Sequence, residues 1–243
     1  MRYKATIEYN GSEFSGWQRQ KDARSIQGEL EKILQLLFRE EITITAAGRT
    51  DSGVHALGQV IHFDVEYPRL QPFQIMNAVN NHLRDSLIAI TNVEIVDETF
   101  DARFSAKRRH YQYRIINRRA PLTIYRKLCW HLFQPLDFDL MLEQAKYLIG
   151  KHDFQSFRSA KCSASNALRT LDQFDIVKNG EEILFSISAR SFLHNQVRIM
   201  VGTLVAIALG AQSSVPEILL KRNRCYAGPT APAHGLYLVK IDY

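Results

Sequence analysis

The segment 46–56 combines residue types that nucleophilic or acid–base chemistry needs. It reads Ala-Ala-Gly-Arg-Thr-Asp-Ser-Gly-Val-His-Ala, with Gly48 and Gly53 on either side of its centre. Glycine lets a backbone turn sharply and approach a ligand closely. Arg49 and Asp51 are two residues apart, so both can face one cleft, where a guanidinium favours the ionised carboxylate. An ionised aspartate can act as a nucleophile or as a base.

The same segment has a simpler interpretation. Thr-Asp-Ser-Gly is ordinary turn chemistry, because aspartate and glycine are common in turns of every kind, and Arg49 is then a surface charge. Judged by composition and spacing alone, the turn interpretation is favoured. The remaining sequence must decide whether Asp51 does chemistry.

A basic run lies near the middle of the chain. No acidic residue occurs between positions 103 and 127, and the cations of the run are Arg103, Lys107, Arg108, Arg109, Arg114, Arg118, Arg119, Arg126 and Lys127. Tyr111 and Tyr113 lie inside it. Phosphates need cations and unpaired bases need flat faces to stack on, so the pattern is compatible with RNA binding. A solvated basic face over two core tyrosines explains it equally well.

Bulk composition limits the possible classes of protein. The chain has 243 residues, 46% of them apolar, which is enough for one large domain or two small ones that share a sheet. No run of about 18 apolar residues predicts a membrane helix, and no secretory signal is visible. Three separated cysteines, and His55 and His62 without a third ligand nearby, indicate neither disulfides nor a metal site. We therefore expect a cytoplasmic protein.

Hydrophobic periodicity predicts an α+β fold with a mostly antiparallel sheet. The expected strands are 3–9, 42–47, 60–65, 87–96, 111–116, 171–177, 183–189 and 236–241. The expected helices are 26–37, 73–83, a helix capped by Asp137 that ends before Gly150, 197–209 and a short helix begun by Ser214 and Glu217. We expect 151–167 to be a loop on the functional face.

The segment 46–56 resembles the catalytic loop of the tRNA pseudouridine synthase A (TruA) family, whose pattern is close to A-G-R-T-D-A-G-V-H-A. Only Ser52 departs from it. Further motifs agree in order: YNG at 9–11, FSGWQRQ at 14–20, SIQ at 25–27, FSA at 104–106, RHYQY at 109–113, FLHNQVR at 192–198 and GLYL at 235–238. Asn10 replaces a usual aspartate, and His110 replaces a frequent arginine, which would weaken RNA binding slightly. The resemblance covers essentially the full chain.

The resemblance implies the pseudouridine-synthase fold: two ferredoxin-like α/β halves that share a mostly antiparallel central sheet with a basic cleft. Residues 1–105 would form the half with the catalytic loop, and residues 106–243 would complete the sheet and the RNA-binding cleft. It further implies a homodimer that acts on tRNA, with no cofactor, no metal and no membrane partner.

Roles follow from the resemblance by matched position. Asp51 matches the essential aspartate, and Arg198 matches the basic residue that orients it and keeps it ionised. Tyr111 matches the tyrosine that stacks on the target uracil, and Arg49 matches the arginine that helps to hold the flipped nucleotide. The expected RNA contacts are Lys107, Arg108, Arg109 and His110.

The implied reaction converts uridine to pseudouridine at positions 38 to 40 of the anticodon stem-loop. It breaks the N1–C1′ bond and forms a C5–C1′ bond without net oxidation or loss of a group, so no redox cofactor is expected. The base must leave its helix to be turned over. Asp51 would attack C1′ as a nucleophile or remove a C2′ proton to give a glycal, and the sequence leaves this choice open.

Two other functions are compatible with the sequence, and each would give Asp51 a different role. In a non-catalytic RNA-binding module, built on a sheet with exposed aromatic residues, Asp51 would be dispensable. A base-excising hydrolase would release free uracil and leave an abasic product. Hydrolytic glycosidases usually need two carboxylates, and the segment around Asp51 offers no second one.

Overall fold

The computed structural model describes residues 1–243, which divide into two units. The first unit consists of Met1–Lys107 and Tyr237–Tyr243, and the second of Arg108–Leu236. The first boundary lies two residues beyond the expected one. The closing strand β10 (Leu236–Asp242) was expected in the C-terminal half. From Tyr237 on it belongs to the first unit, where it pairs with β3 (His55–Asp64).

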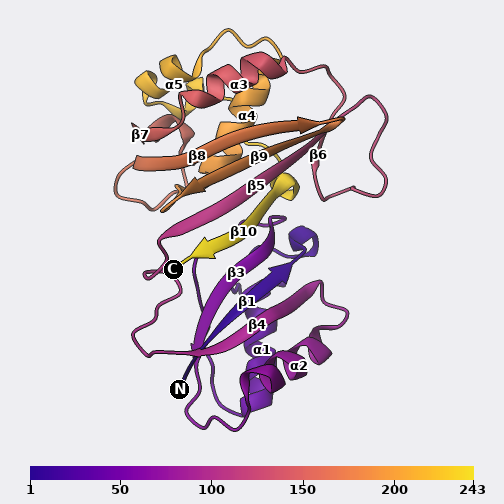
Figure 1. Cartoon of the computed structure of the whole chain (residues 1–243), viewed down its shortest axis with the longest axis vertical. Coiled ribbons are helices and arrows are strands. Elements are labelled where there is room, and N and C mark those ends of the chain that lie inside the picture. The colour runs from indigo at the N-terminus through magenta and orange to yellow at the C-terminus, as the bar shows by residue number, and fades with distance from the viewer. The chain divides into compact units, whose positions relative to one another are not determined.

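The first unit is a sheet with two α-helices, and their arrangement can be followed in Figure 1. Its strands follow the order β4-β1-β3-β10, and β2 pairs with β3. Only the β10–β3 pair is parallel. Helix α2 packs against β4, and α1 packs against α2. The remaining elements are β1 (Arg2–Tyr9), η1 (Gly11–Glu13), α1 (Ile26–Phe38), β2 (Thr45–Ala46), α2 (Pro72–Leu83) and β4 (Ile88–Val96).

Local sequence explains most of these elements. Alternate residues of β1 are buried, as expected for a strand with one face on the core. Ser25 adopts an extended backbone and its side chain accepts a hydrogen bond from the Gly28 N–H, which begins α1 at the predicted residue. Leu30 and Leu34, one helical turn apart, are fully buried on its inner face.

The second unit is a sheet with three helices (Figure 1). Its strands follow the order β5-β9-β8-β7, with β6 parallel to β5 and the other pairs antiparallel. Helix α3 contacts both α4 and β8. Its elements are β5 (Arg108–Asn117), β6 (Trp130–Leu132), α3 (Phe138–Lys146), β7 (Gly150–Asp153), η2 (Gln155–Phe157), β8 (Leu168–Asn179), β9 (Glu182–Ala189), α4 (Gln196–Ala208), α5 (Val215–Lys221), η3 (Arg224–Tyr226) and η4 (Ala233–Gly235). The α+β prediction is confirmed. None of the helices combines the length and apolarity that crossing a bilayer requires.

The predicted strand 42–47 is mostly not a strand. Only Thr45–Ala46 pairs with β3. Ile42 and Ile44 are buried as predicted, but side chains of α1 satisfy their backbone groups. The Ile44 N–H donates to Glu31 Oε1 at 3.0 Å, and Gln35 Nε2 donates to the Ile42 carbonyl at 3.2 Å.

The predicted loop 151–167 begins with ordered structure. Residues 150–153 form β7, which pairs with β8, and η2 follows. Phe154 and Phe157 are fully buried, so this segment contributes to the core of the second unit. Gly150 has a positive φ of 103°, but it begins β7 and does not cap α3, which ends at Lys146.

His62 is a buried polar residue of β3 with a defined protonation state. Its Nδ1 accepts a hydrogen bond from the Ala102 N–H at 3.0 Å, which requires an unprotonated nitrogen. Burial lowers the pKa of His62, and the charge of Arg2 lowers it further, whereas Asp101 and Asp64 raise it. The folded protein therefore favours the neutral ring.

We expect the protein to become less stable as the pH falls, because His62 resists protonation in the folded state. The unfolded chain takes up a proton on this residue near the usual pKa of about 6.5, whereas the folded chain resists it. The contribution is therefore complete above about pH 6.5 and is lost as the pH falls toward the lower, folded-state pKa. The urea midpoint should drop less on acidification in His62→Gln, which keeps an acceptor for Ala102. Equal drops in variant and wild type would contradict this assignment.

Candidate active site

Asp51 lies in the loop that joins β2 to β3. The Val54 N–H donates to the Asp51 carbonyl at 3.1 Å and closes a tight turn, in which Gly53 has a positive φ of 79°. The Asp51 side chain is half-buried, and Arg49 is exposed. The segment is therefore a turn, as its composition indicates. The same turn carries the Asp51 carboxylate, so the turn is compatible with a chemical role for this residue.

The N-terminal segment 9–17 braces this loop. The Trp17 N–H donates to the Thr50 carbonyl at 3.0 Å, and the Ser52 hydroxyl donates to the Phe14 carbonyl at 3.0 Å. A buried hydrogen bond of 2.7 Å joins the Tyr9 hydroxyl to the Thr50 hydroxyl. The residues on both sides of Asp51 are thus fixed by hydrogen bonds.

Two glycines allow the backbone of segment 9–17 to approach the loop. A Cβ atom on Gly16 would lie 2.9 Å from the Thr50 carbonyl oxygen, and the φ of Gly16 is +97°. A Cβ atom on Gly11 would lie 1.9 Å from the Val54 carbonyl oxygen. No side chain fits at either contact, so both positions need glycine.

His55 supports the end of the loop. Its Nδ1 accepts a hydrogen bond from the Gly11 N–H at 3.0 Å, and its ring stacks on Tyr237 with 4.7 Å between centroids. His55 and His62 thus each use Nδ1 to satisfy a buried backbone donor. No group of three or more histidine, cysteine, aspartate or glutamate residues is arranged to hold a metal ion.

Arg49 does not pair with Asp51. No carboxylate lies within 4.0 Å of its guanidinium. That the charge of Arg49 favours the ionised form of Asp51, as their spacing of two indicates, stays a prediction. The Arg49 side chain is exposed.

In the second unit, β5 places Tyr111 on the buried face of its sheet. Tyr111 and Tyr113 pair across to Ile187 and Phe185 of β9, both of which are buried. Tyr113 is fully buried, whereas Tyr111 is half-buried at the less covered end of the strand. Phe192 meets the Tyr111 ring edge-on, with 5.2 Å between centroids and planes at 89°, and this contact orients the ring.

Arg198 lies in the first turn of α4, and two of its hydrogen bonds go to neutral acceptors. Its Nε donates to the Ala231 carbonyl at 2.8 Å, and its Nη1 donates to Asn195 Oδ1 at 2.9 Å. Since Phe192 contacts Tyr111 and Asn195 contacts Arg198, the short segment 192–195 holds both side chains that the sequence singled out in this unit.

Burial keeps two neighbours of Arg198 uncharged. It raises the pKa of the Tyr113 phenol well above 10, although Arg198 acts in the opposite direction. It lowers the pKa of His234, and the charge of Arg198 lowers it further. The Tyr113 hydroxyl donates to the Pro232 carbonyl at 2.7 Å. The fixed positive charge in this cluster is that of Arg198.

The basic run does not form one continuous surface, because successive residues of β5 point to opposite faces. Arg109 lies on the Tyr111 face and donates to the Arg190 carbonyl, whereas His110 pairs with Ser188 across the strand. Three of the arginines form ion pairs within the unit: Arg108 with Asp172 (3.0 Å), Arg114 with Glu182 (2.8 Å) and Arg118 with Glu181 (3.2 Å).

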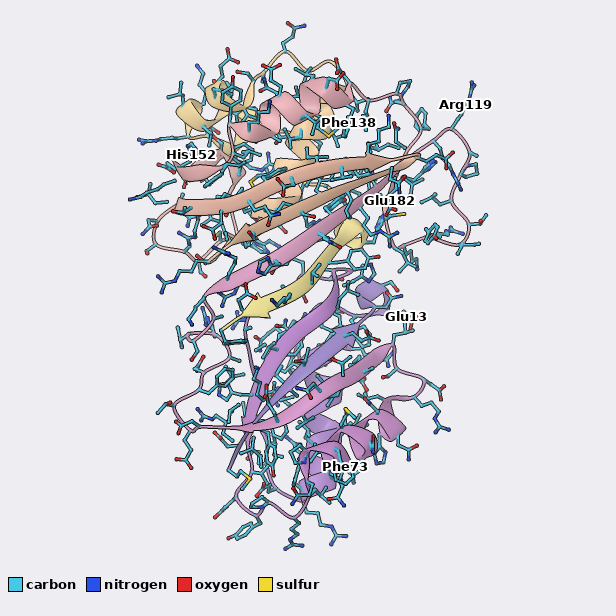
Figure 2. The ribbon with its side chains drawn as sticks, in the orientation of Figure 1. Glu13, Phe73, Arg119, Phe138, His152 and Glu182 are labelled. Carbon is cyan, nitrogen blue, oxygen red and sulfur yellow. The ribbon has the colours of Figure 1, made fainter.

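Other cations of the run remain unpaired. Lys107, Arg119 and Arg126 are exposed and have no carboxylate within 4.0 Å. Arg119 points away from the loop that follows β5 (Figure 2). Arg118 fixes this loop by donating to the carbonyls of Ala120 and Pro121. The loop therefore presents its cations from a defined backbone.

Comparison with known proteins decides the family. A family model described as tRNA pseudouridine synthase matches residues 5–105 and 144–243. The tRNA pseudouridine synthase A of Neorickettsia sennetsu is 65% identical over 243 residues, and that of Wolbachia pipientis wMel is 53% identical over 247. That of Anaplasma phagocytophilum is 49% identical over 247 residues. Each match covers 100% of both chains.

The chain belongs to the tRNA pseudouridine synthase family. Synthases of this family are isomerases that convert uridine in tRNA to pseudouridine. The motif-based resemblance and the pseudouridine-synthase fold class are thereby confirmed.

The sequence reading of this family member missed the supports of its candidate site. Trp17 lies in the motif at 14–20 and is 2% exposed, and its N–H donates to the Thr50 carbonyl. Asn195 and Ala231 had no assigned role, although both hold Arg198. Gly16, in Phe-Ser-Gly-Trp, could have indicated a close backbone approach. No sequence pattern indicates that the Ala231 carbonyl accepts a hydrogen bond from Arg198.

Gly16→Ala should impair catalysis in this synthase more than it impairs folding. Its Cβ would press on the Thr50 carbonyl and displace the loop that carries Asp51, and a displacement of about 1 Å can lower turnover by about 10²-fold. Gly210→Ala is a matched control, because Gly210 has a similar φ of +101° but open space around it. Turnover on tRNA and the melting temperature should be measured for both. Equal turnover in the two variants would contradict the bracing role.

Proposed function

We propose that this protein isomerises uridine to pseudouridine at positions 38 to 40 of the tRNA anticodon stem-loop, with Asp51 as its catalytic residue. The observation that carries the proposal is the position of Asp51. Its half-buried carboxylate stands on a tight turn that hydrogen bonds fix on both sides, through Thr50 and Ser52. Such preorganisation is what a nucleophile or base needs.

The reaction needs only rearrangement of the substrate. The N1–C1′ bond breaks, the base rotates within the site, and a C5–C1′ bond forms. A proton leaves C5 and N1 gains one, so product and substrate have the same atoms. Asp51 either attacks C1′ and is displaced by C5, or removes the C2′ proton and later returns it. Both routes require an ionised carboxylate.

Three further side chains have proposed roles. Tyr111 stacks on the flipped uracil, which is supported by the edge-on contact that fixes its ring. Arg198 orients Asp51 and favours its ionised form, which is supported by the neutral partners that hold its guanidinium. Arg49 holds the backbone of the flipped nucleotide, which is supported by its exposure and its lack of an ion pair.

The tRNA backbone would be bound by cations that the protein does not neutralise itself. Lys107, Arg119 and Arg126 meet this condition and add to the contacts expected from Arg108, Arg109 and His110. We also propose that the first unit supplies the catalytic loop, and that the second supplies the stacking tyrosine and, apart from Lys107, the RNA contacts. The enzyme would act as a homodimer, as the resemblance implies, and in the cytoplasm, as its separated cysteines indicate.

Asp51→Ala should abolish turnover while leaving tRNA binding intact. Loss of an essential nucleophile or base lowers turnover by about 10⁴-fold or more. Pseudouridine should be mapped chemically in an unmodified tRNA transcript, with binding measured in parallel and without added metal or cofactor. Asp22→Ala is the control, since Asp22 is an exposed carboxylate of the same unit.

The outcomes of this experiment separate the candidate functions. If Asp51→Ala keeps its turnover, the assignment of Asp51 is wrong. If the wild type binds tRNA without forming pseudouridine, the protein is an RNA-binding module, and if it releases free uracil, it is a hydrolase. Pseudouridine outside positions 38 to 40 would overturn the proposed target.

Replacing Lys107, Arg119 and Arg126 together by glutamine should weaken tRNA binding without lowering turnover at saturation. The logarithm of the binding constant falls as the logarithm of the salt concentration rises. Each lost phosphate contact makes this slope less steep by about one. The matched control replaces three exposed cations of the first unit, Lys32, Arg39 and Arg69, by glutamine. Binding should be measured across a salt series. Identical slopes for the two triple variants would show that the basic run has no special role.

A further inference from the structure

Asn195 has an unusual conformation for its position. It immediately precedes α4 as the N-cap residue, but its backbone is left-handed, with φ 62° and ψ 7°. N-cap residues are usually extended and accept a hydrogen bond from the second or third backbone N–H of the helix. The side chain of Asn195 makes no such bond. A strained backbone and an unused capping group indicate that another contact determines this residue.

That contact is with Arg198, three residues further along the chain. Asn195 Oδ1 accepts a hydrogen bond from Arg198 Nη1 at 2.9 Å, and the Ala231 carbonyl accepts one from Arg198 Nε at 2.8 Å. Two bonds from different nitrogens fix both the position and the plane of a guanidinium, whose donors are rigidly arranged.

The second support of Arg198 is itself fixed to α4. The Ala231 N–H donates to the Arg198 carbonyl at 3.1 Å, and the Gly228 N–H donates to the Thr203 hydroxyl at 2.9 Å. A Cβ atom on Gly202 would lie 1.9 Å from the Pro229 carbonyl oxygen, so segment 228–231 lies directly against the helix. Asn195, in contrast, is a support of Arg198 that a side-chain substitution can remove.

The chemistry of the support matters as much as its geometry. An amide and a backbone carbonyl accept hydrogen bonds without removing the positive charge of the guanidinium. A carboxylate at position 195 could occupy the same place, but it would form an ion pair with Arg198. Such a pair is stronger than a bond to an amide and offsets the positive charge of the guanidinium. The amide of Asn195 thus orients the cation and leaves its charge intact.

We propose that Asn195 is a positioning residue, which aims the Arg198 guanidinium and keeps its charge available to the catalytic carboxylate. The proposal rests on the role proposed for Arg198 above. It explains why a left-handed backbone occurs at the beginning of α4: this conformation directs the side chain to Arg198 and away from the helix N–H groups.

Two substitutions at this position separate geometry from charge. Asn195→Gly tolerates the positive φ and removes only the side chain, so it should fold. Its kcat should fall by up to about 10²-fold, because Arg198 loses its alignment, while KM changes little. Asn195→Asp keeps the shape and tolerates the same backbone. It should shift the acidic limb of the pH–rate profile to higher pH, because the new carboxylate competes for the charge that favours ionised Asp51.

The experiment measures kcat, KM, the pH–rate profile and the melting temperature on unmodified tRNA. Arg39→Gly is the control for glycine at a left-handed position, since Arg39 has a φ of 59° and is exposed at the end of α1. It should retain wild-type kcat. The proposal is overturned if Asn195→Gly keeps wild-type kcat, or if Asn195→Asp leaves the acidic limb in place. A fall in melting temperature with unchanged kcat would assign Asn195 a structural role only.

Failure of this inference can be told apart from failure of the proposed function. If Asp51→Ala remains active, the catalytic assignment has failed. If Asp51→Ala and Arg198→Ala are both inactive but the Asn195 variants behave as wild type, only the positioning role has failed.

Discussion

The close contact between the backbone of segment 9–17 and the loop that carries Asp51 is the constraint on which the first unit depends. Without side chains at Gly11 and Gly16, the chain comes near enough for the Trp17 N–H to reach the Thr50 carbonyl. The hydroxyls of Tyr9 and Ser52 complete the attachment. A loop that would otherwise be mobile at its tip is thereby held at the residues next to its carboxylate, so less entropy is lost when substrate binds.

The second unit reaches the same result with different means. A short segment before α4 contributes Phe192 to orient Tyr111 and Asn195 to orient Arg198. Segment 228–231 approaches α4 through Gly202 and Gly228, as the N-terminal segment approaches the Asp51 loop. In both units, glycines let one backbone support another, and the supported residues are those that the family resemblance marks.

The arginines of the basic run have two different roles. Arginines 108, 114 and 118 of the basic run stabilise the second unit through ion pairs with neighbouring acids. These exposed or partly exposed pairs each contribute about 0–1 kcal/mol, so their main effect is to order strands and loops. Arg119 and Arg126 lie on the loop that Arg118 fixes. Both are exposed and form no ion pair within the protein. A count of basic residues does not distinguish these two uses.

The sequence by itself determined the family, the α+β class and most element positions, because caps, periodicity and motif order are local. Helix α1 begins at Ile26, and Ser214 and Glu217 begin the short helix α5, as predicted. The tertiary structure decided what depends on contacts between distant residues. It shortened the strand expected at 42–47, since Glu31 and Gln35 satisfy that backbone. It placed most of the last strand in the first unit and left Arg49 without an ion pair. It also divided the basic run by the alternation of β5 and placed the Asn195 side chain against Arg198. Each of these depends on which backbone groups and side chains folding brings together, and local sequence patterns do not encode that.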